Sequence, residues 1–160
     1  MKYMMVLILL SISLFAEVEK TYHKNGDLES ESNFKDGKLE GISNYYYENG
    51  NLESEEIYQN GNLKGLSKTY YNNGNLEAEV NYKDGEREGL FKVYYKNGNL
   101  EVEANYKDGK EEGLSKTYYK NGNLKVEANY KDGKFVSGYK YDKNEMKTKL
   151  TNAHIHNMYK

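Results

Sequence analysis

The stretch GLSKTYYNNGNLEAEVNYKDGERE, from Gly65 to Glu88, is the unit from which most of the chain is built. Copies of this 24-residue unit, some of them degenerate, follow one another from residue 17 onward. Each copy contains two turn signals, which in this unit are Asn73-Gly74 and Asp84-Gly85. A fixed period of this length is typical of repeat proteins in which every unit is one supersecondary element.

Both turn signals predict β-hairpins, because Asn, Asp and Gly tolerate the positive φ that a two-residue type I′ turn requires at both central positions. Alternating apolar and polar residues flank each signal, as expected of half-buried strands. We therefore predict an all-β fold, an elongated single-layer antiparallel meander of tandem 24-residue β-hairpins. The first signal recurs at Asn25-Gly26, Asn49-Gly50, Asn73-Gly74, Asn97-Gly98 and Asn121-Gly122, and the second at Asp36-Gly37, Asn60-Gly61, Asp84-Gly85, Asp108-Gly109 and Asp132-Gly133.

Two-residue loops at both signals predict the pairing across the strands, and the two loops agree on which residues share a face. One face is expected to be apolar and the other charged. On the apolar face we expect the pairs Tyr71–Leu76, Thr69–Ala78, Ser67–Val80, Val80–Gly89, Ala78–Phe91 and Leu76–Val93. On the charged face we expect Tyr70–Glu77, Lys68–Glu79, Lys20–Glu31, Lys92–Glu103 and Lys116–Glu127, with Asn44 opposite Glu55.

A glycine recurs on the apolar face once per unit, at Gly41, Gly65, Gly89 and Gly113. One explanation is that the missing side chain leaves room for a neighbouring ring such as Tyr82 or Tyr106. The other is that these glycines simply begin the strand and are needed for its backbone. The sequence leaves both explanations open.

The aromatic residues form three rows. Two rows lie on the apolar face and are most simply core, since stacked aromatic side chains bury area on a thin sheet. The third row, Tyr46, Tyr70, Tyr94 and Tyr118, lies on the charged face, where burial in a core does not explain it. The first two rows are Tyr58, Tyr82, Tyr106 and Tyr130 with Phe34, and Tyr47, Tyr71, Tyr95 and Tyr119 with His23.

The ends of the chain depart from the repeat. Residues 1–16 contain Lys2, an apolar run from Tyr3 to Phe15 and Ala16, a pattern that predicts a secretory signal peptide cleaved after Ala16. The repeat array is expected over residues 17–138, and residues 139–160 are expected to be a degenerate capping repeat and tail. In that segment Asn144 is aligned with Gly122 and Met146 with Leu124; a short helix carrying Met146, Leu150 and Ala153 is the alternative.

Composition limits the chemistry. The 160 residues include 18 Tyr and no Cys, so a disulfide framework and a thiolate metal site are excluded. His154 and His156 lack further ligands nearby, and Glu53, Glu77 and Glu101 recur exposed in successive units beside Glu55, Glu79 and Glu103. No unique polar group breaks the repeat. We therefore expect no catalytic residue, no metal site and no cofactor.

The unit YYxNGNLExExxYKDGxxEG, as in Tyr70 to Gly89 and Tyr94 to Gly113, closely resembles the MORN repeat variant found in tandem arrays of bacterial proteins, many of them labelled antitoxin-like. The resemblance covers Thr21 to about Gly138. It implies a twisted single-layer sheet of hairpins that serves in protein–protein contact and scaffolding, and in some eukaryotic members in phosphoinositide binding. It carries no catalytic residues.

These observations together predict an exported, non-enzymatic protein–protein interaction module, located outside the cell, in the periplasm or at the cell surface. An antitoxin or immunity-type inhibitor that neutralises a partner toxin is the alternative, and a self-associating envelope protein, such as a homodimer, is a third reading. The formal net charge of −2 becomes one unit more negative when Lys2 is removed, which argues against nucleic acid and anionic lipid as partners.

The charged face is the predicted binding surface. Tyrosine supplies contact area with few rotatable bonds, and charges around it select the partner. The predicted binding residues are Tyr46, Tyr70, Tyr94 and Tyr118, together with Lys68, Lys92 and Lys116.

We predict that residues 1–16 are removed on export, because the apolar run is too short to span a bilayer, for which about 20 residues are needed, and is followed at once by polar residues. Intact-mass spectrometry of the protein recovered outside the cytoplasm should give a chain that begins at Glu17. A secreted chain that still begins at Met1 would contradict the prediction.

Overall fold

The computed structural model describes residues 17–151, so the predicted signal peptide and His154 and His156 lie outside the described residues. Within this range all regular structure is β, in one antiparallel sheet of 14 strands. The strands are β1 Glu17–Tyr22, β2 Leu28–Lys35, β3 Lys38–Tyr46, β4 Leu52–Gln59, β5 Asn62–Leu63, β6 Gly65–Tyr70, β7 Leu76–Lys83, β8 Glu86–Tyr94, β9 Leu100–Lys107, β10 Lys110–Glu111, β11 Gly113–Tyr118, β12 Leu124–Lys131, β13 Lys134–Tyr141 and β14 Lys147–Lys149.

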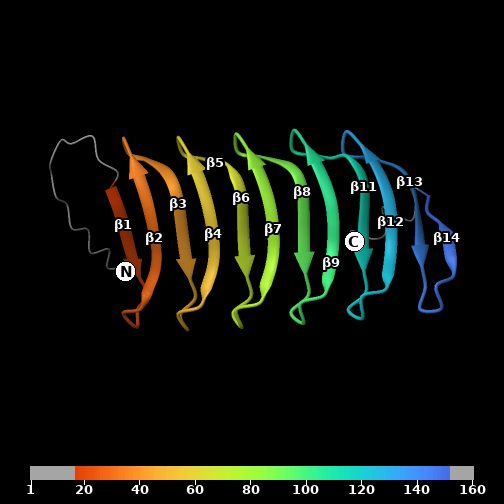
Figure 1. Cartoon of the computed structure of the whole chain (residues 1–160), viewed down its shortest axis with the longest axis horizontal. Helices are drawn as coiled ribbons and strands as arrows, with labels where there is room; N and C mark the ends of the chain where they lie inside the picture. Colours follow the sequence, from red (N-terminus) through yellow and green to blue (C-terminus); the bar gives the residue numbers. More distant parts are fainter. Residues whose placement is uncertain (1–16, 152–160) are drawn as a thin grey trace.

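The strands lie side by side in chain order and form one elongated layer (Figure 1). The short strands β5 and β10 pair with β4 and β9 and continue into β6 and β11. The loops of the first turn signal, which we call the Asn-Gly loops, lie along one edge of the layer (Figure 1). The turns of the second signal, which we call the Asp-Gly turns and which include Asn60-Gly61, lie along the opposite edge. The predicted single-layer meander is therefore confirmed.

The Asp-Gly turns have the predicted geometry. Asp84 has φ of 53° and Gly85 has φ of 84°, so both central residues are left-handed, as type I′ requires. Lys83 pairs with Glu86 and Tyr82 with Arg87, as a two-residue loop demands.

The Asn-Gly turns differ from the prediction. Gly74 has φ of 86°, whereas Asn73 is not left-handed. The Tyr71 amide donates to the Asn75 carbonyl and the Gly74 amide donates to the Tyr71 carbonyl, both at 2.8 Å. The loop therefore has three residues, a type I turn followed by a left-handed glycine. The Asn73 side chain stabilises this turn by accepting from the Asn75 amide at 3.1 Å.

A loop with an odd number of residues would shift the pairing of the two strands by one residue, and a bulge restores the predicted pairing. Tyr70 pairs with Leu76, and the next pair is Thr69 with Ala78, so Glu77 is the extra residue. The predicted pairs Tyr71–Leu76 and Tyr70–Glu77 are therefore wrong, while Thr69–Ala78, Ser67–Val80 and Lys68–Glu79 are confirmed. Since directly paired residues share a face, Leu76 lies on the charged face, opposite to the prediction.

A second irregularity follows each Asp-Gly turn. Val80 pairs with Phe91 and Ala78 with Val93, so the predicted partners Gly89, Phe91 and Val93 are each displaced by two residues. A displacement of two leaves every side chain on its predicted face. The Asn81 side chain fills the irregularity by donating to the Leu90 carbonyl at 3.1 Å.

Gly89 lies in this irregularity with φ of 78°, and a Cβ placed there would meet no atom within 4 Å. Its role is to supply a left-handed backbone, and of the two explanations left open by the sequence, room for a ring is the wrong one. Gly41, Gly65 and Gly113 have the same left-handed backbone.

The apolar face is closed by small side chains at its centre. Ser43 is fully buried, Ala104 is 1% exposed and Ala128 is 2% exposed. The aromatic rows beside them are half-buried, with Phe91 edge-on to Tyr106 at 5.7 Å between ring centroids and Arg87 lying over both rings. The described residues form no second layer over this face. The large aromatic side chains of the sheet itself therefore cover the small residues at its centre.

In the C-terminal segment Lys147–Lys149 forms the strand β14, and neither Met146 nor Leu150 is helical, so the short helix is wrong over its described residues; Ala153 lies outside them. Glu145, with φ of 61°, takes the place of Gly122 in the loop, so the predicted alignment of Asn144 with Gly122 is wrong by one residue. Lys147 accordingly stands opposite Tyr141, where the other units carry leucine. Leu150 is 3% exposed and packs with Val126 and Ala128, which closes the end of the core.

We expect Gly89→Val to lower the free energy of unfolding by more than about 1 kcal/mol, because a β-branched residue is strained at positive φ. Gly89→Asn is the matched control and should cost less, since Asn tolerates this backbone. Urea denaturation of the two variants gives the comparison. Equal midpoints would show that backbone conformation does not require the glycine.

Candidate functional site

The repeats are joined by a ladder of tyrosine hydroxyl groups along the Asn-Gly edge. The Tyr71 hydroxyl donates to the Tyr94 carbonyl of the next unit at 2.7 Å, and Tyr47, Tyr95 and Tyr119 donate in the same way to Tyr70, Tyr118 and Tyr141. In the first unit the His23 ring contacts the Tyr46 carbonyl at 2.7 Å. These side chains thus hold the backbone from which the row Tyr46, Tyr70, Tyr94 and Tyr118 projects.

The structure brings all seven predicted binding residues together on the charged face. The lysines belong to a row that crosses the sheet one residue per strand, which we call the charge row. Every lysine in its central part has a glutamate on both neighbouring strands; Lys92, for example, lies between Glu79 and Glu103. The charge row is Lys20, Glu31, Asn44, Glu55, Lys68, Glu79, Lys92, Glu103, Lys116 and Glu127.

The tyrosines of the charged face do not stand alone. Each is half-buried and paired with a leucine that the bulge turns to this side, as Tyr94 is with Leu100. We call this set the tyrosine–leucine row: Tyr46–Leu52, Tyr70–Leu76, Tyr94–Leu100 and Tyr118–Leu124. The leucines were missed in the sequence because the bulge that reverses their direction has no composition signal of its own.

A third row lies on the other side of the charge row. Ile42, Leu90 and Leu114 lie two residues before Asn44, Lys92 and Lys116 of the charge row, on the same face, and are 47%, 39% and 41% exposed. With Leu66 they form the aliphatic row, and their partners on the next strand are Ile57, Asn81, Asn105 and Asn129. The exact period of 24 residues from Val18 through Leu114 is a signal that could have identified them.

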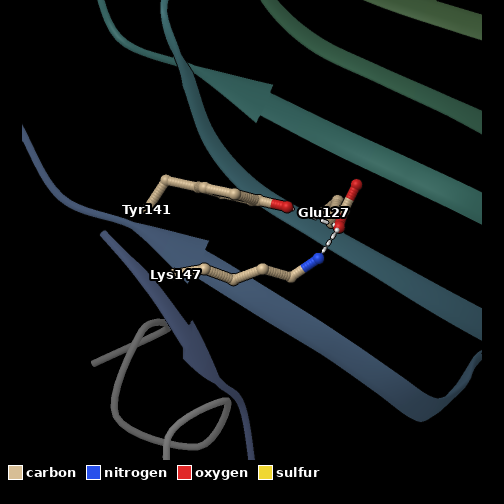
Figure 2. A network of polar contacts seen from close by, with 3 residues as sticks. All are labelled: Glu127, Tyr141 and Lys147. Atoms are coloured by element: carbon tan, nitrogen blue, oxygen red, sulfur yellow. Dashed lines mark hydrogen bonds and ion pairs between the residues drawn. The ribbon is translucent and has the colours of Figure 1, made fainter. Parts of the chain in front are cut away.

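The tyrosine–leucine row also contacts the charge row. The Tyr94 hydroxyl donates to Glu79 Oε2 at 3.0 Å, and burial, followed by this hydrogen bond, raises the pKa of Tyr94 to about 12. At the end of the sheet the Tyr141 hydroxyl donates to Glu127 Oε1 at 2.6 Å, and Lys147 donates to the same oxygen at 3.2 Å (Figure 2). These hydrogen bonds hold the pKa of Glu127 below its ordinary value.

A hollow among the described residues interrupts the regularity of the repeat. It lies on the apolar face, has a volume of about 330 Å³ and is lined by Tyr45, Tyr47, Glu53, Ser54, Glu56, Thr69 and Glu77. Glu53 and Glu77 therefore reach a hollow shared with apolar-face residues, contrary to their predicted place, because each is the extra residue of a bulge. Tyr45 and Glu56 are the departures from the repeat, since the next unit has Thr69 and Val80 in their places. The hollow presents aromatic rings and hydrogen-bond acceptors.

The described residues contain no group of three His, Cys, Asp or Glu side chains placed to hold a metal ion. In the same range, 17–151, no helix is present that is long and apolar enough to cross a membrane.

The family model for the MORN repeat variant matches the chain five times, over residues 18–36, 39–60, 63–84, 87–108 and 111–132. The chain belongs to the MORN repeat variant family. Its repeats are of a kind associated with protein or membrane interactions. The matches end before β13 and β14, where the loop and the strand pairing depart from the other units. No curated protein matches the chain.

The raised pKa of Tyr94 predicts a loss of stability in base. The folded state retains the phenol proton above the ordinary pKa of 10.0, so this contribution is complete below pH 10 and is lost as the pH rises toward about 12. Between about pH 9 and pH 11.5 the parent protein should lose roughly 1 kcal/mol more unfolding free energy than Tyr94→Phe, after allowance for solvent screening.

Urea denaturation at the two pH values measures this difference. Tyr22→Phe, at a ring that is 59% exposed on the edge strand, controls for the loss of one hydroxyl. An identical pH dependence in the parent and Tyr94→Phe would contradict the prediction.

Proposed function

We propose that this protein is an exported, non-enzymatic repeat protein whose charged face binds a partner protein. The observation that carries the proposal is that every repeat contributes residues to three different rows on this face. They are the tyrosine–leucine row, the charge row and the aliphatic row. Membership of the MORN repeat variant family supports an interaction role.

The composition of the rows is that of a protein interface. Tyrosine and exposed aliphatic side chains contribute contact area, while alternating charges set orientation and exclude mismatched partners. Exposed apolar residues scattered singly need no explanation, but Ile42, Leu66, Leu90 and Leu114 follow one another across the sheet at intervals of two strands. At the strand spacing of about 4.8 Å this interval is roughly 10 Å.

The charge on this face favours protein over lipid or nucleic acid. Lys68, Lys92 and Lys116 each have glutamates on both sides, so the face offers no continuous positive surface to phosphate groups. Export is supported by the apolar run from Tyr3 to Phe15. We propose a location outside the cytoplasm on that ground.

The proposal predicts that Tyr70→Ser combined with Tyr94→Ser and Tyr118→Ser removes partner binding. The partner is first recovered by affinity purification from envelope and extracellular fractions and identified by mass spectrometry. The triple variant should bind it at least about tenfold more weakly, because each lost ring removes contact area from the interface. Unchanged circular dichroism would establish that the variant is folded.

Val136→Ser combined with Met146→Ser is the matched control, since these side chains are 61% and 67% exposed and lie outside the three rows. Full affinity of a folded triple variant would exclude the charged face as the binding site. Recovery of a cytoplasmic toxin as the partner, with residues 1–16 retained, would favour the antitoxin reading instead.

A further inference from the structure

The alternating part of the charge row is complementary to itself. From Glu55 to Glu127 it alternates between glutamate and lysine on successive strands without interruption. When such a row is reversed end to end about a point midway between two strands, every lysine position falls on a glutamate position. A surface with this property fits a second copy of itself related by a twofold axis.

We propose that the partner of the charged face is a second copy of this chain, in a symmetric dimer with its twofold axis parallel to the strands and between β7 and β8. The inference rests on the proposed function, in which this face is the interaction surface. The axis places Glu79 opposite Lys92 of the second copy, Lys68 opposite Glu103 and Glu55 opposite Lys116. By symmetry each of these ion pairs forms twice.

The flanking rows fit the same axis. A twofold axis parallel to the strands sets each row against the same row of the second copy. It also sets β8 against β7 of the second copy and β6 against β9. Tyr94 then faces Leu76 of the second copy, and Tyr70 faces Leu100. In the aliphatic row Leu90 faces Asn81, so that a projecting side chain meets a shorter one. The rings and aliphatic side chains supply the buried area, and the charges fix the register.

The position of the axis follows from coverage and charge. The sheet path from β1 to β14 has six strands on either side of the gap between β7 and β8, so this axis covers the whole sheet. A twofold axis across the strands would place each lysine of the charge row on a lysine of the second copy, and repulsion excludes it. Two sheets stacked face to face hold their strands within about 30° of each other at a spacing of about 10 Å, which suits the contact near the axis.

Two single charge reversals test the proposal. In Lys92→Glu the dimer would set the introduced carboxylate against Glu79 twice, and in Glu79→Lys it would set the introduced ammonium group against Lys92 twice. Each variant should self-associate at least about tenfold more weakly than the parent. An equimolar mixture restores both opposite-charge contacts and should form the heterodimer with about the parent's affinity. Sedimentation equilibrium of the purified proteins measures all three.

Control variants carry the same charge changes outside the rows. Lys24→Glu and Glu48→Lys lie at exposed positions in the Asn-Gly loops and should dimerise as the parent does. Dissociation of the parent dimer should also increase with salt, because the row is screened. Circular dichroism tests whether each variant is folded. If either variant is unfolded, the salt dependence of the parent and the matched Lys24→Glu control provide the readout.

Three outcomes would overturn the inference. They are a parent chain that is monomeric at concentrations on the order of 100 µM, a dimer indifferent to both reversals, and a mixture that fails to recover affinity. These results are distinct from failure of the proposed function. If the parent chain is monomeric and the tyrosine triple variant no longer binds a different protein, the charged face is still the binding site. That result rejects only the second copy as the partner.

Discussion

From the second repeat onward, the hydroxyl group of one tyrosine per repeat donates to a backbone carbonyl of the next repeat, and in the first repeat the His23 ring makes the corresponding contact. The bond from Tyr71 to the Tyr94 carbonyl spans 2.7 Å, and the adjoining Asn75 side chain donates to the Lys96 carbonyl at 2.8 Å. A hydrogen bond of this kind contributes about 1 kcal/mol net. In a sheet whose described part has no second layer, such contacts fix the angle between neighbouring hairpins, so the direction of every row on the charged face depends on them.

The three-residue loop and the bulge beside it have opposite effects on the alternation of side chains. A three-residue loop at Asn73-Gly74 reverses the alternation, and the bulge at Glu77 restores it. Between loop and bulge, however, the alternation is inverted. This short inverted stretch turns Leu76 toward Tyr70 and sends Glu77 toward the hollow on the apolar face. The loop and the bulge together therefore decide that Leu76 lies on the charged face and Glu77 on the apolar face.

The sequence was sufficient for the fold class and for the middle of each hairpin closed by an Asn-Gly loop, where the alternation of Ser67, Lys68 and Thr69 is regular and the pairing agrees with the prediction. It was insufficient at Asn73-Gly74, because Asn-Gly suits both a two-residue and a three-residue loop. The choice depends on hydrogen bonds, such as that from the Asn75 amide to Asn73, that no periodicity encodes. The lysines and tyrosines of the candidate site could be assigned to one face, whereas their leucine neighbours could not. The pairing of each lysine with the glutamate across the unit boundary depended on the two-residue displacement after the Asp-Gly turn, which the sequence did not reveal.

The ladder of tyrosine hydroxyl groups restricts the lengths that the array can have. Each hydroxyl needs only the carbonyl of the adjoining unit, so duplication of one whole unit would create a new boundary identical to the existing ones and lengthen the sheet by about 10 Å. Insertion of part of a unit would leave a hydroxyl without its acceptor and the faces out of phase. The geometry therefore permits this protein to change length in evolution by complete 24-residue steps while every row continues across the new boundary unbroken.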